Sequence, residues 1–391
     1  MLDAARRLMS PSARSDVPPF MVMDVIAAAT RIEAAGGRVI HMEVCQPAAP
    51  APRTAIMAAQ AALNGPLRYT ESLGIRPLRE RIARHYGEIY GVDVAADRVV
   101  VTTGSSAAFI LAFLAMFEPG DRVAIASPGY PPYRHILAAL GCEPVLIETS
   151  AQTRWSIDGA MLRAQHARTP LAGVLVASPA NPTGTMMSPQ ALADLIATAE
   201  ELGIRFISDE IYHGLDYTMP AETAARLSQQ AVIINSFSKY FCMTGWRIGW
   251  MVVPEPLVRT LDRLQVNLAI SVPTLSQIAA LAAFDGRAEM DAVKHGYEEN
   301  RRILLDGFPR AGLDTFLPVD GAFYLYADVS RFTNDSADFA RRMLEEVHVA
   351  ATPGIDFDPV RGGRYVRFCY AASADDMHEA VARVGNWLAG R

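Results

Sequence analysis

The sequence predicts an α/β fold with two domains. The large domain would be built on a mostly parallel sheet of the seven-stranded type, flanked by helices, and the smaller domain would also be α/β. From residue 98, short apolar runs alternate with helical stretches, which is typical of a parallel sheet covered on both faces. From about residue 286, a long charged helix and a mixture of strands and helices replace this alternation. A chain of 391 residues is long enough for two domains.

The segment before the sheet is expected to be mainly helical. Residues 1 to about 19 are polar, end in prolines and are expected to form an arm. Helical apolar spacing over Met21–Ala35 ends at two glycines, which commonly stop helices. The next expected elements are the strand Val39–Val44 and the helices Thr54–Leu63 and Pro77–Tyr90.

Strands and covering helices are then predicted in turn along the large domain. The expected strands are short, apolar and rich in β-branched residues: Arg98–Thr102, Arg122–Ala126, Gly173–Ala177, Arg205–Ser208, Ala231–Asn235 and Trp250–Val253. The helices expected between them are Ala107–Phe117, Tyr133–Leu140 and Pro189–Leu202.

The C-terminal elements are expected to form the smaller domain together with the N-terminal segment. They are the helix Met290–Arg310, the strand Gly321–Tyr326, the helix Ser336–Val347, the strand Arg364–Cys369 and the helix Ala374–Leu388. We place the large domain at 44–285 and the small domain at 1–43 and 286–391.

Composition and charge exclude several classes of protein. A net charge of −6 and a pI near 5.8 provide no electrostatic basis for binding nucleic acid. The longest apolar run, Ala107–Phe117, is too short to cross a bilayer as a helix, so no membrane partner is expected. No apolar segment follows Arg6, Arg7 and Arg14, so no secretory signal is expected.

The four cysteines, Cys45, Cys142, Cys242 and Cys369, lie far apart in the sequence. Their spacing is not that of a metal site, and it fits a reducing compartment better than a disulfide framework. We therefore expect a cytoplasmic protein without a bound metal.

Ligands of open parallel sheets bind beyond the carboxyl ends of the strands, so the residues there are candidates for a site. After the first strand of the large domain, a Gly/Ser turn that includes Ser105, Ser106 and Ala107 leads into an apolar helix. Free N–H groups at such a helix start suit a phosphate, although an N-cap serine would also explain these residues.

The next strand ends carry aromatic rings and several polar groups. Tyr130 lies in a rigid proline loop with Tyr133, where the aromatic rings could stack on a flat ligand or pack the loop. Asn181 lies in an Asn-Pro-Thr-Gly turn that leaves its amide free to form hydrogen bonds. Asp209 and Tyr212 follow a further strand, and Asp209 could cap a turn or present its carboxylate to a ring nitrogen.

Lys239 follows the strand Ala231–Asn235, with Ser236 and Ser238 before it and Arg247 eight positions beyond it. Phe237, Tyr240, Phe241 and Trp246 surround it in the sequence. A lysine that is half-buried near another cation loses proton affinity and becomes an amine nucleophile. The alternative interpretation of Lys239 is an ordinary surface lysine. Taken together, the groups at the strand ends suit the phosphate, ring, ring nitrogen, phenolic oxygen and aldehyde of pyridoxal phosphate.

This ordered set resembles the class I/II aminotransferase family of fold-type I pyridoxal-phosphate enzymes. The family signature Ser-x-Ser-Lys-x5-Gly-x-Arg-x-Gly is matched from Ser236 to Gly249. Other matching motifs extend the resemblance from about residue 40 to 370: Tyr69–Arg79, Gly104–Ala107, Pro128–Tyr130, Asn181–Gly184, Asp209–Tyr212, Gly321–Tyr324, and Pro353-Gly354 followed by Arg367.

The resemblance implies an aminotransferase that uses pyridoxal 5'-phosphate to move an amino group from an L-amino acid to a 2-oxo acid in a ping-pong cycle. Lys239 resembles the lysine that holds the cofactor as a Schiff base and shuttles the Cα proton. Asp209 resembles the carboxylate that pairs with the pyridinium nitrogen. Tyr212 and Asn181 resemble the pair that binds the phenolic oxygen, and Tyr130 the ring that stacks on the pyridine.

The resemblance also implies how phosphate, substrate and a second subunit are bound. The phosphate would be held by the backbone at 105–107, by Ser236 and Ser238, and by Arg247. Arg367 resembles the clamp for the substrate α-carboxylate, with a surface arginine as the alternative. Tyr69 resembles a residue that reaches the neighbouring subunit's phosphate, which implies a homodimer with shared active sites.

The sequence departs from the family pattern at Cys45-Gln46-Pro47, where Gly-x-Pro is usual and the backbone approaches the substrate. The side chain of Cys45 could narrow the site, so we include it among the substrate-binding candidates. A lesser departure is Phe357-Asp358, where Phe-Gly is common.

Two other functions and several substrates stay open. A β-eliminating C–S lyase would share the cofactor groups. A non-catalytic ligand sensor would carry an N-terminal DNA-binding domain, for which the first 20 residues are too short and not basic enough. No arginine lies in Gln265–Thr274, and Ser106 stands where some aspartate enzymes place a lysine. These features disfavour a dedicated aspartate enzyme and leave aromatic, alanine-like and branched substrates open.

Overall fold

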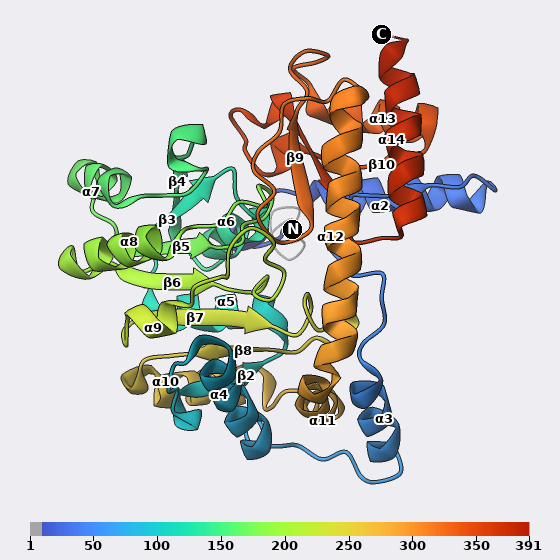
Figure 1. The fold of residues 1–391 in the computed structure, drawn as a ribbon. Helices are drawn as coiled ribbons and strands as arrows, with labels where there is room; N and C mark the ends of the chain where they lie inside the picture. Colours follow the sequence, from blue (N-terminus) through green and yellow to red (C-terminus); the bar gives the residue numbers. More distant parts are fainter. Residues whose placement is uncertain (1–9, 391) are drawn as a thin grey trace, which may run out of the picture.

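A computed structural model describes residues 10–390, so Arg6 and Arg7 lie outside the described residues. Its central sheet has seven strands: β2 (Val99–Thr102), β3 (Arg122–Ser127), β4 (Glu143–Glu148), β5 (Gly173–Ala177), β6 (Arg205–Asp209), β7 (Val232–Ser236) and β8 (Gly249–Val252). Their order in the sheet is β2-β8-β7-β6-β5-β3-β4 (Figure 1). All neighbours are parallel except β8, which is antiparallel to β2 and β7. The predicted mostly parallel sheet is confirmed.

Strand β4 is the one strand of this sheet that sequence analysis did not place. It lies at the edge of the sheet beside β3, its two end residues are exposed, and it opens with Glu143 and Pro144. A proline is tolerated on an edge strand, where it removes no central ladder bond. The segment therefore lacks the continuous apolar pattern by which the buried strands were recognised.

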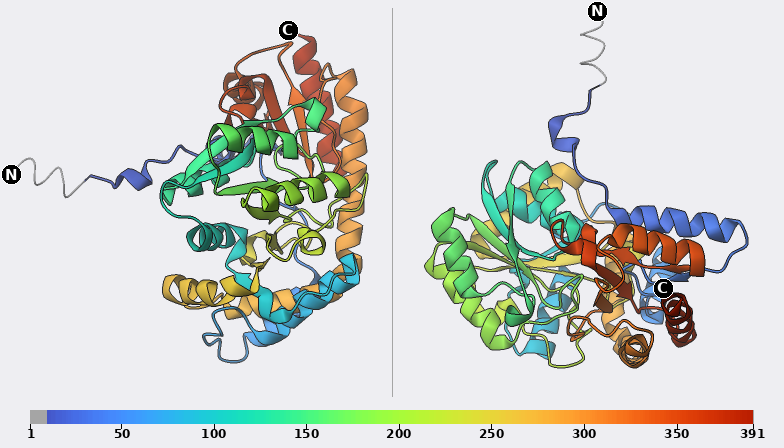
Figure 2. Two further views of the ribbon diagram at one scale, coloured as in Figure 1. Left: turned by 90° about the vertical axis from the view of Figure 1, so that its left-hand side faces the viewer. Right: turned by 90° about the horizontal axis from the view of Figure 1, so that it is seen from above.

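Helices cover both faces of the sheet (Figures 1 and 2). One face packs, in a common buried cluster, against α3 (Arg53–Ala62), α4 (Arg76–Tyr90), α7 (Gly159–Arg168), α8 (Pro189–Glu201), α9 (Ala224–Leu227) and α11 (Thr274–Ala283). The other face packs against α5 (Gly104–Met116), α6 (Pro131–Ala139) and α10 (Glu255–Ala269). Consecutive residues of β2 and β7 alternate between the two clusters, as side chains of a strand must.

A second group of elements lies beyond the carboxyl ends of the central strands. Its sheets are the antiparallel set β9 (Tyr324–Asp328), β11 (Thr352–Pro353) and β12 (Tyr365–Cys369), and the parallel pair β1 (Ile40–His41) and β10 (Val349–Ala350). Its helices are α2 (Met21–Ala34), α12 (Arg287–Arg310), α13 (Ser336–Val347) and α14 (Ala374–Ala389). In Figure 1, α12 runs alongside both groups of elements.

Short 3-10 helices connect these elements: η1 (Ala13–Ser15), η2 (Ala96–Arg98), η3 (Ala151–Thr153), η4 (Thr244–Trp246), η5 (Phe284–Gly286), η6 (Gly354–Asp356) and η7 (Gly362–Arg364). Residues 10–19 are exposed and extend away from the body (Figure 2). Within residues 10–390, no helix combines the length and the apolar character needed to cross a bilayer.

Two expected boundaries were wrong in ways that bear on the site. The strand expected at Val39–Val44 is only β1, because its partner β10 is two residues long and the chain then enters the loop of Cys45. The helix expected from Ala107 begins at Gly104, so residues 105–107 form its first turn.

Candidate active site

The carboxyl ends of the central strands border a cavity of about 230 Å³ that helix α2 also lines. This is where an open parallel sheet binds ligands. Nine of the predicted site residues line it: Cys45, Ser105, Ser106, Tyr130, Asn181, Tyr212, Ser238, Lys239 and Arg247. Three more, Asp209, Ser236 and Arg367, each form a hydrogen bond with a residue that lines the cavity.

Lys239 lies in the turn after β7 and is half-buried. Its Nζ donates a hydrogen bond to the carbonyl of Cys45 and lies 5.7 Å from the centre of the Tyr212 ring. Burial lowers the pKa of this amine, and the guanidinium groups of Arg367 and Arg247 lower it further. Lys239 is therefore held in a setting that favours its neutral, nucleophilic form.

The aromatic residues beside Lys239 in the sequence do not surround its amine. Phe237 and Phe241 point into the core below the sheet, where the Phe237 ring lies 4.9 Å from that of Trp250. The rings near Nζ are instead those of Tyr212 and, at 5.8 Å, Phe323. The expected local aromatic setting was wrong, because a turn sends neighbouring side chains in different directions.

Asp209 ends strand β6 and is only 1% exposed. Its Oδ2 accepts a hydrogen bond from the Tyr133 hydroxyl, and its Oδ1 accepts one from the backbone N–H of Ile211 at 3.1 Å. Burial raises the pKa of this carboxyl to about 6, while the two hydrogen bonds and Lys239 act in the opposite direction. A buried carboxylate held in this way is suited to a cationic partner such as a protonated ring nitrogen.

Tyr212 follows Asp209 on the same loop, and its hydroxyl shares a 2.6 Å hydrogen bond with the hydroxyl of Tyr324. Burial raises the pKa of Tyr212 well above its ordinary value, so the phenol stays protonated and can donate. Asn181 lies across the cavity, and its Oδ1 accepts a hydrogen bond from Arg367 at 2.7 Å.

Arg367 lies on β12 and is fully buried, so a surface arginine, the alternative left open by the sequence, was wrong. Besides Asn181, it donates to the carbonyl of Glu43 at 2.6 Å and to the Thr352 hydroxyl at 3.0 Å. Its guanidinium lies between the rings of Tyr324 and Phe357, at 4.6 and 4.7 Å from their centres. Its Nε has no partner among the described residues.

The first turn of α5 offers backbone N–H groups to an anion. Its N-cap is Thr103, which makes no side-chain cap, so the N-cap serine considered from the sequence was wrong. Arg247 packs against this turn so closely that a Cβ at Gly104 would lie 2.5 Å from its Nη2. The hydroxyls of Ser236 and Ser238 bond each other at 2.8 Å. An uncapped helix start, an arginine and two hydroxyls suit a phosphate.

The donor set therefore fits pyridoxal phosphate: a phosphate cradle, a buried carboxylate and an amine of lowered pKa border one cavity. Ala107 does not itself line the cavity, although it belongs to the same turn. Tyr69 is 80% exposed and does not border the cavity within a single chain.

Sequence reasoning missed several residues that shape the site. Tyr133 contacts Asp209, and the only signal was its place in the loop of Tyr130. Tyr324 contacts Tyr212 and belongs to the matching motif Gly321–Tyr324, to which the sequence assigns no role. Four apolar side chains of α2 and its N-cap had no signal at all: Phe20, Val22, Met23 and Ile26 line the cavity.

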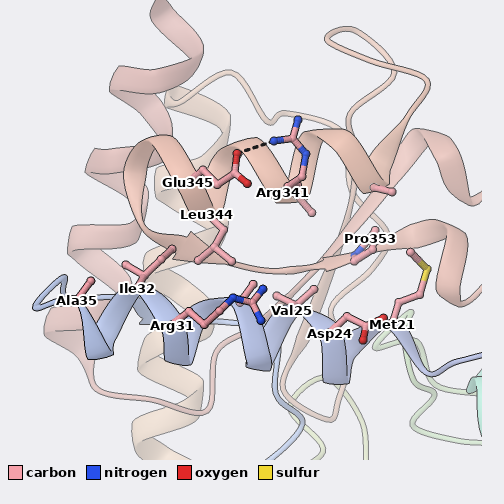
Figure 3. A pocket seen from close by; sticks show the side chains of 13 residues that line it. Met21, Asp24, Val25, Arg31, Ile32, Ala35, Arg341, Leu344, Glu345 and Pro353 are labelled. Atoms are coloured by element: carbon pink, nitrogen blue, oxygen red, sulfur yellow. Dashed lines mark hydrogen bonds and ion pairs between the residues drawn. The ribbon is translucent and has the colours of Figure 1, made fainter.

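Helix α2 has different neighbours on its two sides. The side with Met23 and Ile26 borders the cavity, whereas Val25 and Ile32 border a separate groove against α13 (Figure 3). That groove measures about 420 Å³, so α13 does not pack tightly against α2 along it. The helix is therefore a wall of the active-site cavity that rests on strands β10 and β11.

Comparisons with known proteins agree with this geometry. Residues 40–384 match the family described as aminotransferase class I and II. The chain is 50% identical to valine–pyruvate aminotransferase of Mycobacterium tuberculosis over 96% of this chain and 97% of that one. It is 31% identical to an aspartate aminotransferase of Thermotoga maritima, over 96% and 98% of the two chains. A crystal structure of an aminotransferase from M. tuberculosis superposes with a TM-score of 0.95 at 49% identity, covering 98% of this chain and 100% of that one.

Proposed function

This chain belongs to the class I and II aminotransferase family and is a pyridoxal-phosphate-dependent aminotransferase, and we propose that its amino donor is a small apolar L-amino acid, such as valine, and its acceptor pyruvate. The single observation that carries the proposal is the apolar wall that α2 contributes to the cavity. Val22, Met23 and Ile26 stand there with Ile211, and none of them can pair with a polar substrate side chain. The similarity to a valine–pyruvate aminotransferase supports the same substrate class.

The charges around the cavity support an apolar donor as well. The basic residues that line it are Lys239 and Arg247, and Arg367 lies behind Asn181. We assign these three to the cofactor's attachment, the phosphate and the substrate α-carboxylate. No further cation of the described residues lines the cavity to bind a second substrate carboxylate. A dicarboxylic donor would therefore leave its distal charge unpaired, which is costly in a confined site.

The catalytic roles follow from the site geometry. When bound, pyridoxal phosphate supplies a carbonyl that takes up the substrate amine and a protonated ring that withdraws electrons from Cα. The first turn of α5, Ser236, Ser238 and Arg247 would hold its phosphate, and Tyr130 would stack on its ring. The Asp209 carboxylate would keep the ring nitrogen protonated.

The remaining groups act on the substrate and on the phenolic oxygen. The Tyr212 hydroxyl and the Asn181 amide would bind that oxygen. The amine of Lys239 would take the proton from the substrate Cα as a general base and return it during the second half of the cycle. The guanidinium of Arg367, which bonds Asn181, would bind the α-carboxylate. The carbonyl of Cys45 accepts a hydrogen bond from Lys239 Nζ.

We further propose the domain division at 44–285 and at 1–43 with 286–391, of which residues 1–9 lie outside the described part. The buried cluster that joins Ile40 and Met42 to the C-terminal elements supports it. We propose a homodimer in which Tyr69 reaches the partner's site, as its 80% exposure permits. The four cysteines form no disulfide, which supports a cytoplasmic location.

Steady-state kinetics with a panel of amino donors and pyruvate tests the substrate proposal. We expect the kcat/KM of L-valine to exceed that of L-aspartate by at least about tenfold, the usual effect of an unpaired charge or a missing contact. An equal or higher value for L-aspartate would overturn the assignment. The comparisons do not favour the lyase alternative. An assay with a cysteine-like thioether and no oxo acid would detect that activity, because β-elimination expels the thiol and releases ammonia and pyruvate.

A further inference from the structure

The hydroxyls of Tyr324 and Tyr212 share a hydrogen bond of 2.6 Å, and which of them donates decides what Tyr212 offers to the active-site cavity. We propose that Tyr324 is the donor and thereby a positioning residue. It turns the O–H of Tyr212 towards the cavity, where that group would meet the phenolic oxygen of pyridoxal phosphate. The proposal rests on the role proposed above for Tyr212 and adds the residue that sets it.

The surroundings of the two hydroxyls determine the direction of this bond. Tyr324 is fully buried and does not line the cavity, and its hydroxyl has no hydrogen-bond partner among the described residues except Tyr212. If Tyr212 donated, the proton of Tyr324 would be buried without an acceptor, which is unfavourable. If Tyr324 donates, its proton has an acceptor, and the proton of Tyr212, which lines the cavity, is free to meet a ligand.

Tyr212 lies where a donor to the cofactor is needed. Lys239 Nζ is 5.7 Å from the centre of the Tyr212 ring. The phenolic oxygen of pyridoxal phosphate lies on the ring carbon next to the one that carries the aldehyde, so attachment to Lys239 would bring this oxygen into the same part of the cavity. Burial raises the pKa of Tyr212 well above its ordinary value, and the bond with Tyr324 acts in the opposite direction. A hydroxyl that accepts such a bond becomes a stronger donor itself.

The position of Tyr324 is fixed by its strand and by two neighbouring side chains. It opens β9, where it pairs with Cys369 of β12. Its ring centre is 5.6 Å from that of Tyr212, with the planes at 81°, and 4.6 Å from the guanidinium of Arg367. The ring of Tyr324 thus packs on the proposed carboxylate clamp, whereas its hydroxyl bonds Tyr212. Replacement of Tyr324 with phenylalanine removes the second contact and keeps the first.

A pH titration of the cofactor absorbance in the loaded, substrate-free enzyme tests this proposal. The absorbance changes when the nitrogen that joins the cofactor to Lys239 loses its proton. A negatively charged phenolic oxygen stabilises that proton, and a hydrogen bond from Tyr212 to this oxygen weakens the stabilisation. Tyr324→Phe should therefore raise the midpoint of the titration by about 0.5 to 1 pH unit, a part of the effect of one hydrogen bond to a charged group.

A double-mutant cycle separates this role from a structural one. Tyr212→Phe should raise the midpoint at least as far as Tyr324→Phe does. In the Tyr212→Phe background, Tyr324→Phe should add nothing, because Tyr324 acts through Tyr212. The KM of the amino donor should be the same in Tyr324→Phe as in the wild type, since the ring on Arg367 remains.

The matched control is Tyr370→Phe, which removes another hydroxyl of a fully buried tyrosine. This hydroxyl bonds the Ala322 carbonyl at 3.4 Å and does not line the cavity, so the midpoint should stay unchanged. Incorporation of 3-fluorotyrosine at position 324 tests the bond even if Tyr324→Phe fails to fold. Fluorine withdraws electrons and makes the hydroxyl a stronger donor, so the midpoint should fall.

An unchanged midpoint in Tyr324→Phe would overturn the proposal, and a lowered one would do so by making Tyr324 the acceptor. Equal rises in the wild-type and Tyr212→Phe backgrounds would show an effect that does not pass through Tyr212, and they would also overturn it. So would a midpoint that 3-fluorotyrosine raises or leaves unchanged. A Tyr212→Phe midpoint equal to that of the wild type would overturn the role of Tyr212 and this proposal with it, whereas the substrate class is tested by the panel of amino donors alone.

Discussion

The hydroxyl of Tyr133 donates a hydrogen bond to Oδ2 of Asp209, and both side chains are buried, with Tyr133 bordering the active-site cavity. Tyr133 belongs to α6 and Asp209 to the end of β6, so the bond joins a covering helix to the sheet. The bond counteracts the rise that burial causes in the Asp209 pKa. We therefore propose that Tyr133 is a positioning residue that would act on the cofactor ring through Asp209.

Replacing Tyr133 with phenylalanine should lower kcat and raise the midpoint of the acidic limb of the pH profile of kcat/KM. Without the hydroxyl, the pKa of Asp209 rises further, so less of it is ionised at a given pH. Loss of one hydrogen bond to a charged group predicts a decrease of about tenfold to a hundredfold.

The matched control is Tyr90→Phe, which removes another buried hydroxyl, bonded to His213 at 2.8 Å. It should leave the acidic limb unchanged. An acidic limb that is the same in wild type and Tyr133→Phe would contradict the role assigned to Tyr133.

Asp209→Asn should stabilise the cofactor-free protein at pH 8 and have little effect at pH 4. The folded-state pKa of Asp209, about 6, lies above the ordinary value of 3.8 for this carboxyl. The protonated Asp209 carboxyl therefore contributes to the free energy of unfolding. This contribution is fully present below pH 3.8 and is lost as the pH rises through 6. The shift corresponds to roughly 3 kcal/mol as an upper bound.

Urea unfolding of the cofactor-free wild type and Asp209→Asn at the two pH values measures this effect. The same substitution should greatly lower transamination, because it removes the proposed partner of the ring nitrogen. An Asp209→Asn protein less stable than the wild type at pH 8 would contradict this prediction. It would show that other groups of the protein compensate for the burial of the charged carboxylate.

Arg367→Lys should raise the KM of both the amino donor and the oxo acid by about tenfold to a hundredfold. Lysine keeps the positive charge. A single ammonium group cannot, however, bond Asn181, Thr352 and a substrate carboxylate in the geometry of a guanidinium. Arg364→Lys, on the exposed residue that precedes β12, is the control and should leave KM unchanged. Equal KM values for Arg367→Lys and the wild type would exclude Arg367 as the carboxylate clamp.

The positions of Lys239 and Asp209 could be predicted from the sequence, because both follow apolar runs and parallel strands bring their carboxyl ends to one edge. The contact of Tyr133 with Asp209 could not. It depends on how α6 docks on the sheet, with the Tyr133 ring 5.1 Å from that of Phe109. Helix α2 itself was predicted, but its place at the cavity lacked a signal, since it is distant in sequence from the other site residues and lines the cavity only through tertiary packing.

Two inactive variants that differ in the affected residue should complement each other if the active sites are shared. We expect Lys239→Ala and Tyr69→Ala to lack most activity separately. After joint refolding, the preparation should regain roughly a quarter of wild-type activity, because half the dimers are mixed and each mixed dimer has one intact site out of two. No recovery in a confirmed mixed dimer would show that Tyr69 does not act in the partner's site.

The attachment point of the cofactor tests the central claim most directly. The chain contains only two lysines, Lys239 and Lys294, and Lys294 is paired with Asp216 at 2.9 Å. Reduction of the loaded enzyme with borohydride, followed by peptide mass spectrometry, should find the pyridoxyl phosphate group on Lys239 alone. Lys294→Arg should keep the label and the activity, whereas Lys239→Ala should lose both. A label on Lys294, or full activity of Lys239→Ala, would contradict the assignment of Lys239 as the catalytic lysine.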